Sequence, residues 1–112
     1  MMPNQWVAIA TENELAPGQM KRVVADGRRL LLCNADGRLY VVDEMCSHED
    51  FSLSLGCIQN GRIKCSLHGS YFDLETGAPL CEPASEPIGT YPVRIENGQV
   101  LVQTRMKEQG QK

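Results

Sequence analysis

The chain has 112 residues and a mass of 12.4 kDa, which is the size of one domain and excludes an enzyme with separate cofactor and substrate domains. Hydrophobic residues make up 42% and charged residues 22%, a composition typical of a folded globular protein. The net charge of −3 argues against a basic surface that binds nucleic acid or membranes. The longest apolar run, residues 30–33, is too short to cross a bilayer.

Two strands are expected in the first quarter of the chain. Residues 6–10 predict the first strand, and residues 11–14 resemble a capping box that starts one helical turn at most. Pro17-Gly18 ends that turn. Residues 19–25 predict a second strand, which Asp26-Gly27 ends.

Turn sequences divide the rest of the chain into further short strands. Asn34-Ala35-Asp36-Gly37 predicts a hairpin between its flanking strands, and Asn97-Gly98 predicts the final one. The strands expected here cover residues 29–33, 38–43, 62–64, 70–74, 91–96 and 99–104. Short strands at close spacing favour an antiparallel all-β sandwich or a barrel-like fold.

A proline-rich segment interrupts this pattern. Residues 78–87 hold three of the six prolines. Proline fixes φ and has no backbone N–H, so this segment is predicted to be a stiff loop and not a central strand.

Both histidines of the chain lie close to cysteines. Cys46 is followed by His48, and after sixteen intervening residues Cys65 is followed by His68. The five cysteines and the lack of an export signal predict a reducing cytoplasm, where such residues bind metals more often than they form disulfides. Two loops that each supply one thiolate and one imidazole can close on a single inorganic centre.

The spacing of these four residues favours a [2Fe–2S] cluster over zinc. Four Cys₂His₂ ligands suit tetrahedral zinc, but zinc sites usually pair cysteine with cysteine and histidine with histidine. Here each pair is mixed, and one gap is a single residue. A zinc site and a metal-free chain both stay open as alternatives at this point.

The double motif resembles that of Rieske [2Fe–2S] proteins. Residues 46–54 (CSHEDFSLS) and 65–73 (CSLHGSYFD) are similar to the small Rieske ferredoxins of bacterial aromatic ring-hydroxylating dioxygenases, and so are residues 83–87, 91–93 and 97–98. The resemblance implies a Rieske-like antiparallel β-sandwich with a two-loop cluster-binding subdomain. It implies one domain over residues 1–106, with the cluster-binding part at about 44–85 and a polar tail at 107–112.

The resemblance also implies the cofactor and its ligands. One [2Fe–2S] cluster per chain is expected, with Cys46 and Cys65 on the inner iron, His48 and His68 on the outer iron, and the loop at Pro83 as a third wall. Two ferric ions, two sulfides and two thiolates together carry no net charge, so the oxidised centre is neutral. Four thiolates would give the centre two negative charges. Reduction is therefore easier, at about −150 to +300 mV for such centres.

Four positions bear on the reduction potential by the same resemblance. Phe51 and Leu67 stand where high-potential members have a disulfide. Ser70 matches a serine that bonds a cluster sulfide, but Phe72 replaces a tyrosine hydroxyl. We therefore predict a potential at the low end of the range.

The implied role is that of an electron carrier without catalysis of its own. Its partners would be a flavin-dependent NADH reductase and a terminal oxygenase, and no nucleic acid or membrane is expected. Two alternatives are the small Rieske-like subunit of a nitrite reductase and a zinc-stabilised interaction module.

The remaining residues receive structural interpretations. The acidic residues Asp43, Glu44, Glu49 and Asp50 form either a collar that steers a basic partner or a solvated loop. The arginines and lysine at 21–22 and 28–29 are expected to be solvated. Expected in the core are the aromatic residues Trp6, Tyr40, Phe72 and Tyr91, with Tyr71 on the opposite face, and the spare cysteines Cys33, Cys57 and Cys81.

Overall fold

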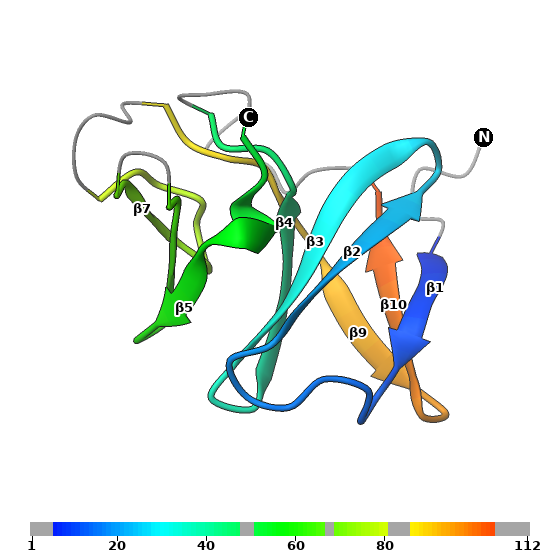
Figure 1. The fold of residues 1–112 in the computed structure, drawn as a ribbon. Coiled ribbons are helices and arrows are strands. Elements are labelled where there is room, and N and C mark those ends of the chain that lie inside the picture. The colour runs from blue at the N-terminus through cyan, green and yellow to red at the C-terminus, as the bar shows by residue number, and fades with distance from the viewer. Residues whose placement is uncertain (1–5, 48–50, 67–68, 81–85, 105–112) are drawn as a thin grey trace.

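The computed structural model describes residues 6–47, 51–66, 69–80 and 86–104 and confirms an antiparallel all-β fold (Figure 1). The described strands form three sheets, with the orders β1-β10-β9, β2-β3-β4-β8 and β5-β6-β7. The elements are β1 (Trp6–Thr11), β2 (Met20–Ala25), β3 (Arg28–Ala35), β4 (Arg38–Asp43), the 3-10 helix η1 (Leu53–Leu55), β5 (Cys57–Gln59), β6 (Arg62–Lys64), β7 (Tyr71–Asp73), β8 (Thr90–Tyr91), β9 (Val93–Glu96) and β10 (Gln99–Gln103). No helix in the described part of the chain is long and apolar enough to cross a membrane.

Four hairpins turn through two residues of positive φ. The turns are Asp26-Gly27, Asp36-Gly37, Asn60-Gly61 and Asn97-Gly98, with φ between 51° and 91°. Two consecutive residues in this region match the twist of the flanking strands, which explains why Asp or Asn precedes Gly each time. β3 extends through Ala35, so its turn has two residues and not the four that the sequence indicated.

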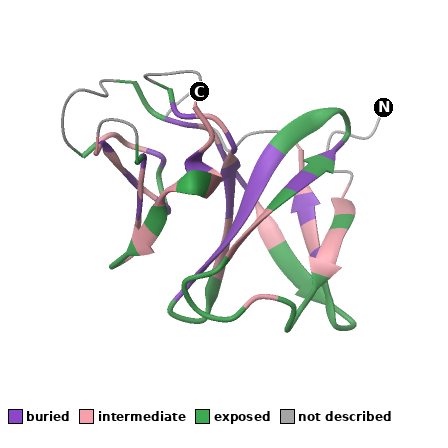
Figure 2. Cartoon of the chain, viewed as in Figure 1, coloured by how far each residue is buried: buried purple, intermediate pink, exposed green. Residues whose placement is uncertain are grey.

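The sheet β2-β3-β4-β8 is covered on both faces. Leu30 and Leu32 of β3 join a core with Val100 and Val102 of β10. Leu31 and Cys33 face the opposite way, into a second core that includes Phe72 of β7. Figure 2 shows β3 as buried along most of its length. Double-sided burial explains the continuous apolar run at 30–33, because a strand with one solvated face would alternate.

Two expected elements differ in the structure. Residues 12–15 form turns and bends instead of a helical turn, although Thr11 N–H donates to Glu14 Oε1 at 3.1 Å as a capping box requires. The expected strand at 91–96 is divided at Pro92, with β8 paired to β4 and β9 paired to β10. Proline has no N–H to donate, so the chain changes sheets there.

The expectations for the aromatic side chains are partly confirmed. Phe72 and Tyr91 are buried, and Tyr71 lies on the opposite face of β7 from Phe72. Trp6 and Tyr40 are only half-buried, and each has an arginine over its ring. Arg94 and Arg38 thus cover faces that the core does not reach.

Gly56 is a position where only glycine fits. A Cβ there would lie 1.7 Å from the carbonyl oxygen of Lys64. We expect Gly56→Ala to lower the free energy of unfolding by about 1–3 kcal/mol, because backbone must move to admit the methyl group. Urea denaturation measures this. The neighbouring Leu55 is 65% exposed, and Leu55→Ala should change the free energy of unfolding by less than about 0.5 kcal/mol. Equal effects of the two variants would contradict the steric argument.

Candidate metal centre

The first cysteine opens a loop whose two ends are hydrogen-bonded to each other. The loop follows β4, and Cys46 N–H donates to Phe51 O at 2.9 Å. Met45 and Ser52 form an isolated antiparallel bridge just outside this bond. Residues 46 to 51 are therefore closed into a loop, and Cys46 is buried at its start.

The second cysteine opens a loop of the same kind. It follows β6, and Cys65 N–H donates to Ser70 O at 2.7 Å. Gly69 N–H donates back to Cys65 O at 2.9 Å, and Gly69 has a φ of 75°. Cys65 and Ser70 are almost completely buried, with 1% and 0% of their surfaces exposed. Each loop thus runs from a buried cysteine to a carbonyl five residues later.

The two loops deliver their cysteines to one place in the core. Cys46 and Cys65 belong to the same buried cluster, together with Leu53, Ile63 and Phe72. Neither of the two forms a disulfide. In the sequence, His48 falls between Cys46 and Phe51, and His68 falls between Cys65 and Ser70. Both histidines lie outside the described residues. Among the residues that the structure does describe, no group of three or more potential ligands occurs.

The other positions tied to the cluster are placed only in part. Phe72 is fully buried among the cysteines, Ser70 is buried beside Cys65, and Phe51 is half-buried at the end of the first loop. Leu67 and Pro83 lie outside the described residues.

The spare cysteines have different environments. Burial raises the pKa of the Cys33 thiol to about 12, which suits the expected role as a small core residue. Cys57 is exposed on β5, so the expectation that it is buried is wrong. Its strand is not recognisable from composition. Cys81 lies outside the described residues.

Asp43 and Glu44, the two described residues of the expected acidic collar, are engaged in hydrogen bonds within the chain. Asp43 accepts hydrogen bonds from Gly89 N–H and from the hydroxyl of Tyr91. Glu44 is 4% exposed and accepts from Arg29 Nε at 3.2 Å and Ser52 Oγ at 2.7 Å. These carboxylates hold neighbouring segments in place instead of facing a partner. Glu49 and Asp50 lie outside the described residues.

Glu44 is ionised although it is buried. Burial raises its pKa, but the hydrogen bonds from Ser52 and Arg29 and the charges of Arg29 and Arg22 outweigh burial and leave the pKa lowered. Arg29 is therefore not a purely solvated strand end. The ion pair joins β3 to Glu44, two residues before the first loop begins at Cys46, a role that the sequence pattern did not reveal.

The proline-rich segment is attached to the first loop at its far end. Ser47 Oγ donates to Glu86 O, and Asp43 N–H donates to Gly89 O at 3.0 Å. Ser47 immediately follows Cys46 in the sequence. These bonds hold residues 86–89 beside Asp43 and Ser47, next to the loop that Cys46 opens.

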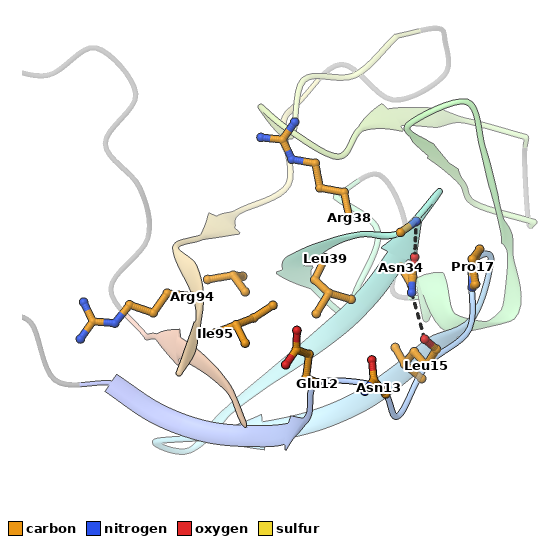
Figure 3. A pocket seen from close by; sticks show the side chains of 11 residues that line it. Glu12, Asn13, Leu15, Pro17, Asn34, Arg38, Leu39, Arg94 and Ile95 are labelled. Carbon is orange, nitrogen blue, oxygen red and sulfur yellow. Dashed lines mark hydrogen bonds between the residues drawn. The ribbon is translucent and has the colours of Figure 1, made fainter. Parts of the chain in front are cut away.

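A separate groove lies between loops that carry neither cysteine. It has a volume of about 560 Å³ and is bounded by residues 12–17, the β3–β4 hairpin and β9. Figure 3 shows Asn34 bonded to Leu15 O and to the N–H of Gly37 across its wall. No thiol lines this groove, so it is not the metal centre.

The chemistry of the described donors fits an iron–sulfur centre. Two buried thiols at the start of two closed loops offer paired sulfur ligands shielded from water, as the inner iron of such a centre requires. A model of the Rieske [2Fe-2S] domain family matches residues 5–92. The chain belongs to the Rieske [2Fe-2S] family. This membership favours the iron–sulfur cluster over zinc.

Individual relatives agree with this family. The chain is 34% identical over 101 residues to the ferredoxin component of the naphthalene 1,2-dioxygenase system of Pseudomonas putida, which covers 90% of this chain and 97% of that protein. The biphenyl 2,3-dioxygenase ferredoxin component of Rhodococcus jostii is 35% identical, over 84% of this chain and 88% of that protein. A chain from the complex of reduced oxygenase and oxidized ferredoxin in carbazole 1,9a-dioxygenase superposes with a TM-score of 0.88 at 28% identity, covering 95% of this chain and 99% of that one.

Glu44 offers a test of how the first loop is anchored. We expect Glu44→Gln to lower the free energy of unfolding by about 1–3 kcal/mol, because the charged hydrogen bonds to Arg29 and Ser52 are weakened in a buried place. Glu14 pairs with Lys21 on the surface, so Glu14→Gln should change stability little. Chemical denaturation of both variants measures the two changes. An unchanged free energy of unfolding in Glu44→Gln would show that the ion pair does not anchor the loop.

Proposed function

We propose that this Rieske protein is an electron-transfer ferredoxin that passes single electrons from a flavin-dependent NADH reductase to a terminal aromatic-ring-hydroxylating dioxygenase. The observation that carries the proposal is the near full-length match to dioxygenase ferredoxin components, combined with two buried cysteines that open two closed loops. The oxygenase as partner is supported by the carbazole dioxygenase complex, in which a similar ferredoxin is bound to its oxygenase. The reductase follows from the need for an electron source.

We assign the ligands by combining the motif with the described loops. Cys46 and Cys65 would hold the inner iron, and His48 and His68 the outer iron, within a cluster-binding part at about 44–85. The burial of both thiols supports the first half of this assignment. The cluster, when bound, supplies one-electron redox chemistry.

The chain's own residues would exclude water and fix the ligands. Phe72, Leu53 and Ile63 surround the cysteines with apolar side chains, which keeps the sulfur ligands out of water. The bonds Cys46 N–Phe51 O and Cys65 N–Ser70 O fix the backbone of the two cysteines. Such preorganisation limits the movement that a change of oxidation state demands. Phe72 has no hydroxyl to donate, which supports a potential at the low end of the Rieske range.

The location also belongs to this proposal. None of the four described cysteines forms a disulfide, including the exposed Cys57. We assign the protein to the cytoplasm because Cys46 and Cys65, each followed closely by a histidine, suit metal binding, which is more typical of a reducing compartment than disulfide formation.

The ligand assignment predicts which cysteines are required. The purified protein should contain two irons and two acid-labile sulfides per chain, and Cys65→Ser should lose both. The matched variant Cys57→Ser alters an exposed thiol outside the loops and should retain them. Metal and sulfide analysis with visible absorption spectra gives the answer. One zinc per chain, or loss of iron in Cys57→Ser alone, would overturn the assignment.

The mixed ligand set predicts the direction of a change in potential. His68→Cys should lower the midpoint potential, since a third thiolate adds negative charge and makes reduction harder. Electrochemistry on the cluster-containing variant measures this, with Cys57→Ser as the unchanged reference. A potential that is equal or higher in His68→Cys would contradict ligation by His68.

Reconstitution tests the carrier role itself. The protein, reduced by a dioxygenase reductase and NADH, should restore oxidation of an aromatic substrate by the matching oxygenase. Wild-type protein with a full cluster that supports no electron flow with any such pair would refute the proposed function.

A further inference from the structure

The small sheet β5-β6-β7 has one face in the core and one face directed outward. Ile63 and Phe72 are paired across β6 and β7, and both are buried. The adjacent pair, Lys64 and Tyr71, must therefore point to the other side, because side chains alternate along a strand. We call the surface made by Arg62, Lys64 and Tyr71 the outer face.

Two cations converge on one ring at the outer face. The guanidinium carbon of Arg62 lies 4.7 Å from the centroid of the Tyr71 ring, and Lys64 Nζ lies 5.7 Å from it. The Tyr71 hydroxyl is in turn bonded to Gln59 Oε1 at 3.1 Å. The ring thus restrains two positive charges side by side, and less side-chain entropy is lost when a partner binds them.

These two cations have no internal counter-charge within the described chain. Lys21 pairs with Glu14, Arg29 and Arg22 pair with Glu44, and Arg94 pairs with Glu96. In the part of the chain that the structure covers, no carboxylate lies within 4.0 Å of the charged nitrogens of Arg62 or Lys64. Arg28 and Arg38 also lack such a carboxylate among the described residues, but Arg62 and Lys64 differ from them in sharing one aromatic ring.

The nearest acidic residue in the sheet is engaged elsewhere. Asp73 is paired with Arg62 across the strands. Its Oδ1 accepts from Glu75 N–H at 2.7 Å and from Thr76 N–H at 3.1 Å, which directs the carboxylate into the turn after β7. The half-buried Arg62 therefore makes no ion pair within 4.0 Å with Asp73.

The outer face borders the loop that supplies the second cysteine. Lys64 immediately precedes Cys65, and a Cβ on Gly69 would lie 3.8 Å from Lys64 Cε. The lysine side chain thus extends along the loop that begins at Cys65 and contains position 68 in its sequence. A protein seated on the outer face would also meet this loop.

We propose that the outer face is a docking surface for a redox partner protein that presents carboxylates next to its own electron-transfer group. This proposal rests on the proposed function. Arg62 and Lys64 would pair with those carboxylates and bring the partner against the loop from Cys65 to Ser70. A weak, salt-sensitive contact of this kind speeds encounter more than it adds affinity, which suits a carrier that must dissociate after each electron.

Charge reversal at Arg62 tests the proposal against a matched control. Arg38 is also unpaired among the described residues and lies 5.7 Å over Tyr40, but it stands at the start of β4, next to the β3–β4 turn. Arg62→Glu and Arg38→Glu change the net charge equally. Rapid-mixing kinetics would measure the second-order rate constants with the reductase and with the oxygenase, separately, at low and high salt.

We expect Arg62→Glu to lower at least one rate constant about tenfold at low salt and to weaken its salt dependence, while Arg38→Glu changes neither more than about twofold. Arg62→Lys should keep most of the rate, since it preserves the charge. Iron content and absorption spectra confirm that each variant carries its cluster. Should Arg62→Glu destabilise the sheet, Arg62→Gln provides the same comparison with half the change in charge.

Three outcomes overturn the docking surface. Unchanged rates in Arg62→Glu, or equal losses in Arg38→Glu, would exclude it. If the wild type self-associates and Arg62→Glu abolishes that association, the outer face binds a second copy of this chain instead of a redox partner. Wild-type protein that exchanges electrons with neither partner would refute the proposed function itself. That result is distinct from a failure of the docking surface, because it is seen in the wild type before any variant is compared.

Discussion

The structure depends on β3 and β4 being buried on both faces. Leu30 and Leu32 contribute to one core, and Leu31 and Cys33 to the other, so a single pair of strands joins the β1-β10-β9 sheet to the β5-β6-β7 unit. Burial of each such leucine stabilises the fold by about 1.5–3 kcal/mol. The first cysteine loop follows directly from β4, and its position is therefore fixed by the strand that both cores hold.

The two cysteine loops have the same construction. Each begins with a buried cysteine after a strand and is closed by a bond from the cysteine N–H to a carbonyl five residues later. Closing a loop locally lowers the entropy that a ligand set must lose when metal binds. Charged residues near the loops divide into two kinds. Glu44 and Asp43 accept hydrogen bonds that hold the segments beside the first loop, whereas the half-buried Arg62 and Lys64 beside the second loop lie over the Tyr71 ring.

This division matters for how a small carrier works. A domain of 112 residues has little room for separate structural and docking regions. Buried carboxylates that are hydrogen-bonded on several sides stabilise and orient the loops. Cations that are stacked on an aromatic ring, with no carboxylate within 4.0 Å in the described part of the chain, keep their attraction for another molecule. The same types of side chain thus serve different purposes according to what surrounds them.

Local signals determined much of this protein. The pairs of Asp or Asn with Gly fixed four hairpins, because few other residues adopt positive φ twice in succession, and the Cys-x-H and Cys-x-x-H spacing identified the family. The tertiary structure decided what depends on distant partners: Glu44 is an anchor because Arg29 and Ser52 reach it, Cys57 is exposed because β5 turns it outward, and Arg62 meets Lys64 on one ring because β6 and β7 pair in that register. A charge or a thiol in a sequence has no environment until segments far apart in the chain have packed around it.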